Sequence, residues 1–145
     1  MDARVDRLQM NLVDKLTVGL SAELRLIVAK EMTIGHFVAD MPLVYATPIM
    51  ILHMEMAAGS AIASLLPSGF VSVGTAVDVR HLAATPVGGK VHVIASMTEV
   101  GTRSVTFETE AWNEVRKIGE GTHSRAIVNV KEFEKRFGVR DSALA

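Results

Sequence analysis

Apolar residues dominate one long stretch in the first half of the chain, from Thr47 to Leu66. The stretch predicts a helix, because Thr47 is a favourable N-cap, Pro48 fits the first helical position and Pro67 ends the pattern. Its apolar residues fall on nearly every side, which is typical of a helix buried inside a protein. The helix contains a single carboxylate, Glu55.

Glu55 needs a physical explanation, because burying an unpaired carboxylate costs several kcal/mol. It is the only acidic residue between Asp40 and Asp78, so it does not belong to a solvated charged face. A buried carboxylate needs a partner, and such groups gather at functional sites. We therefore expect Glu55 to be buried and to act as a catalytic base or acid.

Apolar and polar residues alternate elsewhere in the chain, which is the pattern of half-buried strands. Short turns rich in glycine, proline or asparagine separate the strands that follow the helix. The segment of residues 33–44 predicts a loop. The predicted strands cover residues 21–32, 71–81, 90–99, 104–112 and 118–130.

The predicted order is one strand, one long helix and then four strands joined by short turns. A helix this apolar is hidden only if a curved antiparallel sheet wraps it, so the predicted fold class is α+β. We expect one domain over residues 21–135. Residues 1–20 predict an arm or a short helix, and the charged end from Lys131 predicts a frayed tail that includes residues 136–145.

The bulk composition excludes several classes of protein. Lys and Arg number 15 against 16 Asp and Glu, without a basic run, so nucleic acid is not an expected partner. Polar residues interrupt the longest apolar stretch, which argues against a membrane span. The first residues lack the layout of a signal peptide, and the chain has no cysteine. We expect a cytoplasmic protein.

Three residues carry the chemistry of acyl transfer: the hydroxyl of Thr47, the carboxylate of Glu55 and the imidazole of His81 at the end of a strand. Sequence alone does not show that they meet. Thr47 also has a purely structural interpretation as a helix cap, and His81 as a hydrogen-bonded histidine at a strand end. The backbone N–H of Gly74 is a candidate donor to a carbonyl oxygen. No metal is expected, because the histidines lack a metal-binding spacing.

Three ordered motifs, at residues 44–50 with Glu55, at 74–88 and at 118–126, resemble the fluoroacetyl-CoA thioesterase family of hotdog-fold proteins. The resemblance runs from about residue 24 to residue 133. It implies a hotdog fold, in which a curved antiparallel sheet surrounds one helix. This agrees with the order derived above.

The resemblance also implies a function: hydrolysis of an acyl-CoA thioester by Thr47, Glu55 and His81. It matches Gly74 and Arg125 to substrate-binding positions. It implies a homodimer that binds acyl-CoA near the subunit interface, with CoA as part of the substrate and no further cofactor. The family's fluoroacetyl-specific enzyme has phenylalanines ahead of the threonine, where this chain has the substrate-binding candidates Val38 and Met41. We therefore expect a short acyl group other than fluoroacetyl.

Several alternatives stay open at the level of sequence. Thr47 attacks the thioester or positions a water molecule, and Glu55 acts as a base or as the nucleophile. A different class is a non-catalytic hotdog module that binds acyl-CoA or another apolar ligand, although such a module does not need Glu55. A hydratase on the same fold needs an Asp and a His close together in one segment, and the chain lacks that pattern.

Overall fold

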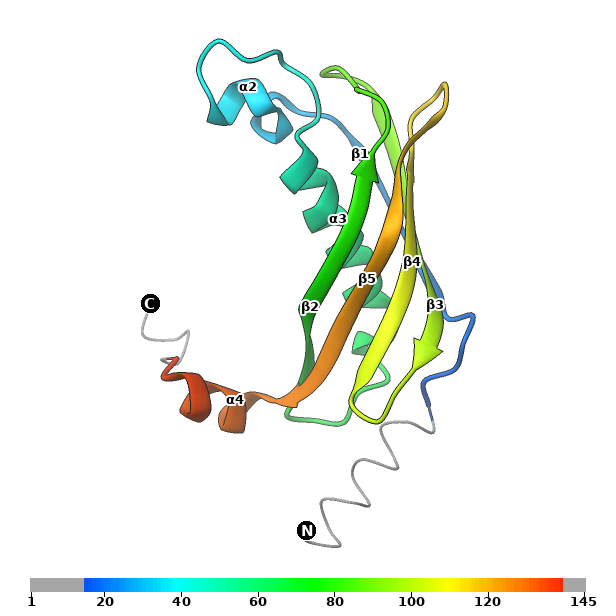
Figure 1. Cartoon of the computed structure of the whole chain (residues 1–145), viewed down its shortest axis with the longest axis vertical. Coiled ribbons are helices and arrows are strands. Elements are labelled where there is room, and N and C mark those ends of the chain that lie inside the picture. The colour runs from blue at the N-terminus through cyan, green and yellow to red at the C-terminus, as the bar shows by residue number, and fades with distance from the viewer. Residues whose placement is uncertain (1–14, 140–145) are drawn as a thin grey trace, which may run out of the picture.

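A computed structural model describes residues 15–139 and shows one sheet curved around one long helix, which confirms the α+β hotdog prediction (Figure 1). All pairings are antiparallel, in the order β1-β3-β4-β5-β2, so β1 and β2 are the two edges. The strands are β1 Ser21–Ile27, β2 Phe70–His81, β3 Lys90–Val100, β4 Ser104–Trp112 and β5 Lys117–Asn129. The helices are η1 Lys30–Met32, α2 Ile34–Phe37, α3 Thr47–Ala63 and α4 Val130–Phe137.

The element boundaries depart from the predicted ones where short helices occur. The first strand stops at Ile27 rather than at residue 32, because the chain turns into η1. The predicted loop contains α2, which Thr33 caps by accepting a hydrogen bond from the N–H of His36. The prediction of a frayed tail is wrong for residues 131–137, which form most of α4. Residues 1–14 and 140–145 lie outside the described part of the chain.

One face of α3 forms the centre of the core. The fully buried residues of α3 face the sheet and include Met50 and Met54. Gly119 in β5 allows this close approach, because a Cβ there would lie 2.6 Å from the sulfur of Met50. A glycine inside a strand often marks a place where another part of the chain approaches closely, and Gly119 does so here for Met50.

The opposite face of α3 is not covered by any other part of residues 15–139. Leu52 is 46% exposed and Met56 is 51% exposed, and Glu55 between them is only half-buried. The prediction that α3 is buried on every side is therefore wrong for a single chain, because a single curved sheet covers only one side of a helix. An apolar helix face left open on one chain suggests a further partner.

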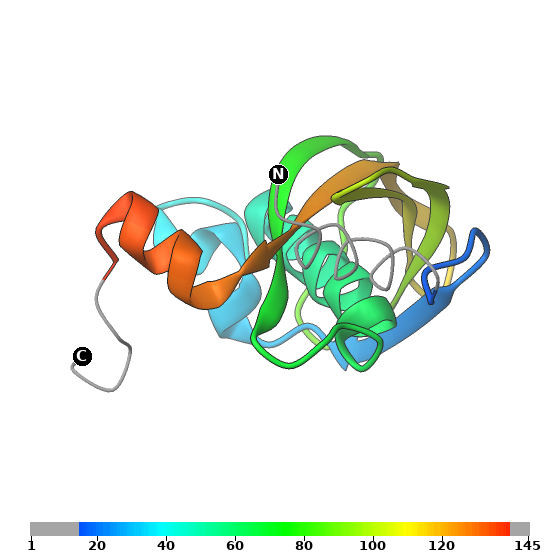
Figure 2. The same cartoon turned by 90° about the horizontal axis from the view of Figure 1, so that it is seen from below.

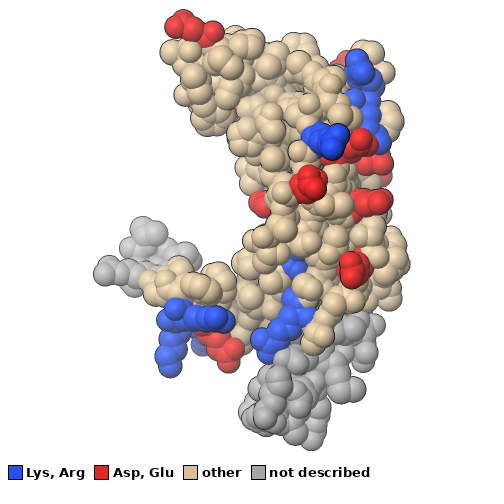
Figure 3. All heavy atoms as spheres, in the orientation of Figure 1, with Lys and Arg blue, Asp and Glu red and all other residues tan. Residues whose placement is uncertain are grey.

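The free edge of β2 runs beside this open face. Val71 and Val77 in β2 are 42% and 41% exposed, and a β-bulge interrupts the register between Gly74 and Ala76. The segment of residues 34–46, which includes α2, projects at one end of β2, and α4 projects at the other end (Figures 1 and 2). Figure 3 shows the hollow between the two projections, whose surface carries few charged side chains. Within residues 15–139, no helix is long and apolar enough to cross a membrane.

A second strand glycine supports the sheet through its missing side chain. A Cβ at Gly121 would lie 2.1 Å from the carbonyl oxygen of Asp78 in β2. We expect Gly121→Ala to destabilise the protein by about 1–3 kcal/mol, because the backbone of β2 must move. The midpoint of urea unfolding measures the change. The control is Gly101→Ala, whose Cβ would meet the Oγ of Ser104, a side chain that can rotate away. Equal midpoints for the two variants would contradict this account of Gly121.

Candidate active site

A hydroxyl and an imidazole meet where α3 begins and β2 ends. Thr47 is the first residue of α3, and His81 is the last residue of β2. The Oγ1 atom of Thr47 lies 2.8 Å from Nδ1 of His81, at hydrogen-bond distance. The structure thus brings together two of the three residues that the sequence analysis selects, although they lie 34 positions apart.

His81 is prepared to accept a proton. Burial lowers its pKa below the ordinary value of 6.5, and the backbone of Ala83 opposes this shift. The imidazole is therefore neutral at neutral pH. A hydroxyl paired with a neutral imidazole can lose its proton as the hydroxyl or a bound water attacks.

Tyr45 and His53 pack next to the Thr47–His81 pair and hold the His81 ring. The hydroxyl of Tyr45 lies 2.5 Å from Nδ1 of His53, and the two rings stack with centroids 5.7 Å apart. The Tyr45 ring also meets His81 edge to face at 6.4 Å. Burial raises the pKa of Tyr45 and lowers the pKa of His53, so both are neutral. The sequence analysis missed this support, because Tyr45 precedes the helix and its spacing to His53 predicts no contact.

An apolar hollow of about 500 Å³ opens beside Thr47 and His81. Of the two residues predicted to contact the acyl group, Met41 lines this hollow. Val38 belongs to the same segment and is 49% exposed, but it does not line the hollow. The other lining residues are Ile34, Val44, Tyr45, Ala46, Pro48, Leu82, Ala83 and Ala84.

Glu55 does not join Thr47 and His81 within one chain. It lies eight positions after Thr47 on α3, which corresponds to about 12 Å along the helix axis. Its carboxylate points toward the middle of β2, where a Cβ on Gly74 would lie 2.7 Å from its Oε1 atom. Gly74 therefore makes room for the Glu55 side chain.

A partly buried network holds the helix turn that carries Glu55. Arg125 donates from Nε to Oγ of Ser72 at 2.8 Å, and from Nη1 to the Glu55 carbonyl at 3.4 Å and to Nε2 of His123 at 3.1 Å. His123 accepts at Nε2, so its Nδ1 atom carries the proton and donates to the Ala76 carbonyl at 2.9 Å. Burial lowers the pKa of Arg125, and the charge of Glu55 opposes this. The guanidinium thus contacts the turn of Glu55, and its contact with substrate stays a prediction.

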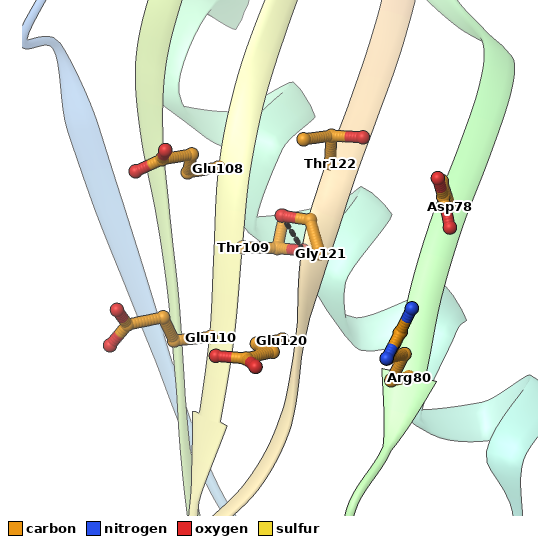
Figure 4. A pocket seen from close by; sticks show the side chains of 8 residues that line it. All are labelled: Asp78, Arg80, Glu108, Thr109, Glu110, Glu120, Gly121 and Thr122. Carbon is orange, nitrogen blue, oxygen red and sulfur yellow. Dashed lines mark hydrogen bonds between the residues drawn. The ribbon is translucent and has the colours of Figure 1, made fainter.

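A second hollow lies on the outer face of the sheet (Figure 4). In Figure 4, α3 lies behind the strands, so the hollow opens on the side of the sheet away from the core. Four carboxylates and Arg80 surround the hollow, and this charge disfavours an anionic ligand. No cluster of His, Asp and Glu within residues 15–139 suits a metal ion. The carboxylates belong to Asp78, Glu108, Glu110 and Glu120.

Comparison with known proteins relates the site to a family. Residues 28–131 match the family model described as fluoroacetyl-CoA-specific thioesterase. The fluoroacetyl-CoA thioesterase of Streptantibioticus cattleyicolor is 41% identical over 95 residues, which are 66% of this chain and 68% of that protein.

Solved structures agree in both fold and sequence. A crystal structure of a variant of a fluoroacetyl-CoA-specific thioesterase with fluoroacetate and CoA matches with a TM-score of 0.78 and 35% identity, over 81% of this chain and 99% of that one. A hot-dog-like protein from Thermanaerovibrio acidaminovorans matches with a TM-score of 0.82 over 89% of this chain and 96% of that one. Its identity of 23% supports the fold alone.

Proposed function

Since the chain belongs to the fluoroacetyl-CoA-specific thioesterase family and hydrolyses an acyl-CoA thioester, we propose that the Thr47–His81 pair is where the thioester is cleaved. The products are a free acid and CoA. The observation that carries this proposal is the 2.8 Å contact between the Thr47 hydroxyl and the His81 imidazole, beside an apolar hollow. The binding-module alternative leaves this contact without a purpose.

The proposed reaction forms a carbon–oxygen bond and breaks the carbon–sulfur bond. Either Thr47 attacks the thioester carbon and water then releases the acid, or Thr47 positions a water molecule that attacks directly. In both routes His81 takes the proton from the attacking oxygen and returns it to the departing sulfur. The N-terminus of α3 lies at Thr47, and the positive end of the helix dipole there favours the negative oxygen of the intermediate. The route needs no cofactor besides the CoA of the substrate.

A homodimer supplies Glu55 to this site in our proposal. Two copies would meet through the free edges of β2, with the exposed apolar side chains Leu52, Met56 and Val77 between them. Antiparallel pairing of the two edges, centred near Val77, would set Gly74 of one copy level with His81 of the partner subunit. Glu55 lies beside Gly74. Its carboxylate would then face a pair that it does not reach within its own chain, and it would act as base or nucleophile there.

We propose a short acyl group as the substrate, with Met41 as part of the wall of its hollow and Val38 in the adjacent surface. The hollow is lined mainly by apolar side chains, which favours an unsubstituted acyl chain over a charged one. The lack of cysteine supports a cytoplasmic location.

Release of free CoA thiol from a panel of acyl-CoAs tests the proposal. We expect turnover of short, unsubstituted acyl groups such as acetyl and propionyl, with fluoroacetyl-CoA as one member of the panel. A strong preference for fluoroacetyl-CoA would overturn the proposed acyl group. Binding without release of thiol from any member would favour the module that only binds acyl-CoA.

The pH dependence should report His81. As pH falls, His81 takes up a proton and no longer acts as a base, so kcat/KM should fall with an apparent pKa below 6.5, in the direction that burial sets. The profile of kcat/KM is obtained from initial rates of thiol release at several concentrations of a short acyl-CoA. The variant His92→Gln removes a histidine on the outer face of the sheet and should leave the profile unchanged. An acidic limb well above 6.5 would argue against a neutral, buried His81 as the base.

The room beside Glu55 should matter for catalysis. We expect Gly74→Ala to lower kcat by about 10² or more, because the new Cβ displaces a carboxylate whose position is critical. The protein should stay folded, since the Glu55 side chain can rotate away. Initial rates measured beside the Gly101→Ala control test this. Unchanged kcat in Gly74→Ala would show that the position of Glu55 is not needed.

A further inference from the structure

Helix α4 has an apolar face that the rest of residues 15–139 leaves open. Val130, Phe133 and Phe137 follow helical spacing on one face, and the rings of Phe133 and Phe137 lie 4.8 Å apart. Phe137 is 60% exposed, and Val139 just beyond the helix is 51% exposed. An amphipathic helix normally buries such a face. No residue of α4 is buried, so within residues 15–139 the helix lacks a partner for this face.

The direction of α4 is set by its connections. The N–H of Val130 donates to the Gly69 carbonyl at 2.9 Å, and the Asn129 side chain caps the helix by accepting from the Glu132 N–H at 3.1 Å. These bonds tie α4 to the end of β5 and to the turn before β2. The helix therefore projects outward beyond the edge of β2, on the same side as the 34–46 segment (Figures 1 and 2).

The strand register decides what α4 meets in a dimer. Phe70, the first residue of β2, pairs with Asn129, so α4 lies at the start of β2. His81 and the acyl hollow lie at the other end. If two β2 edges pair antiparallel, the start of one strand lies beside the end of the other. Each α4 then lies against the 34–46 segment of the partner subunit.

The surfaces that would meet are complementary. The 34–46 segment exposes Phe37 and Leu43, at 56% and 46%, and its single acidic residue is Asp40. The last turn of α4 carries the basic residues Lys135 and Arg136. Apolar side chains would cover one another, with opposite charges at the rim, as in stable interfaces.

We propose that α4 of each copy packs on the 34–46 segment of the partner subunit and holds that segment over the partner's acyl hollow. This inference rests on the homodimer of the proposed function. It assigns α4 a specific role, because each acyl hollow is then closed by a helix from the other chain. Each active site would then depend on the partner subunit twice, for the carboxylate of Glu55 and for the helix α4 that holds the 34–46 segment in place.

Cysteine cross-linking tests the contact directly, since the chain has no cysteine of its own. The variants Phe37→Cys and Phe137→Cys are made separately, mixed to exchange subunits and treated with a short thiol-reactive cross-linker. We expect a covalent dimer in the mixture and little in either variant alone, because the two copies of each position lie at opposite ends of the dimer. The matched control replaces Phe137→Cys by Val115→Cys, in a turn where Val115 is 87% exposed.

A second measurement tests the role of the contact. Phe137→Ser should raise KM for a short acyl-CoA and weaken the dimer by about tenfold, because an interface aromatic is lost. Its monomer should stay folded, since Phe137 is exposed there. Val115→Ser should change neither quantity.

The outcomes separate this inference from the proposed function. An active dimer without the Phe37–Phe137 cross-link would overturn the role of α4 alone. A protein that is monomeric by sedimentation yet fully active would overturn the proposed dimer and this inference together. If the cross-link forms between the two variants but the unaltered protein releases no thiol from any acyl-CoA, the result would instead count against the catalytic proposal.

Discussion

Replacing Glu55 by glutamine should abolish most thioester hydrolysis and leave a folded dimer. Glutamine keeps the size of the side chain but removes its charge and its basicity. We expect kcat to fall by about 10²–10⁴, the usual contribution of a general base. The fold should survive, because Glu55 is only half-buried and the bond from Arg125 reaches its backbone carbonyl. Steady-state thiol release measures kcat, and sedimentation measures the dimer.

The control for this variant is Glu108→Gln. Glu108 has the same chemistry but lies on the outer face of the sheet, away from α3 (Figure 4). Its activity should match that of the unaltered protein. If Glu55→Gln kept a large share of the activity, Glu55 would be structural and the reaction would depend on the Thr47–His81 pair alone.

Mixing two inactive variants shows which chain provides Glu55. In a dimer formed from Glu55→Gln and Thr47→Ala chains, a site assembled across the interface is intact once and doubly damaged once. Random exchange of subunits should then restore about a quarter of the original activity. If each chain used its own Glu55, no mixed dimer would contain an intact site, and the mixture would stay inactive.

The second large effect should come from the Thr47–His81 pair. We expect Thr47→Ala and His81→Ala each to lower kcat by about 10²–10⁴, because each removes one partner of the proton transfer. The double variant should be little worse than either single one, since the two side chains act as a unit. The rates of the three variants, measured with one acyl-CoA, form the test.

The matched control for the hydroxyl is Thr98→Ala. Thr98 lies on β3, is exposed, and donates to the Thr106 carbonyl at 3.3 Å. It should keep full activity. Losses that simply multiply in the double variant would mean that Thr47 and His81 act independently, and the 2.8 Å contact would then lose its catalytic meaning.

The order of strands and helix follows from local pattern, and the sequence alone predicts it well. Alternation of apolar and polar residues reports a half-buried strand wherever it occurs, so β4 begins and ends where the pattern does. Pro48 similarly marks the beginning of α3, but Ala46 rather than Thr47 is the N-cap, and the helix ends at Ala63 rather than at Leu66. Helix α4 is the exception: its charges favour a solvated tail, although Val130, Phe133 and Phe137 have helical spacing.

Glu55 is a residue whose surroundings cannot be predicted from the local sequence pattern. An apolar helix with one carboxylate must be covered, but its sequence does not say whether the sheet or another chain covers each side. The structure shows that the sheet covers the side of Met50 and Met54 and leaves Leu52 and Met56 open. The place of Glu55 beside Gly74 depends on that orientation, because both lie next to the free edge of β2.

Periodicity and side-chain chemistry are enough to predict the fold class and the residue types that acyl transfer requires, because both are local properties of the chain. Which of these residues meet depends on the tertiary structure. Thr47 and His81 are 34 positions apart, and their contact depends on how β2 lies along α3. The same packing places Tyr45 and His53 beside this pair. It also keeps Glu55 away from Thr47 and His81 within one chain. Packing between distant elements sets these distances, and no local pattern encodes them.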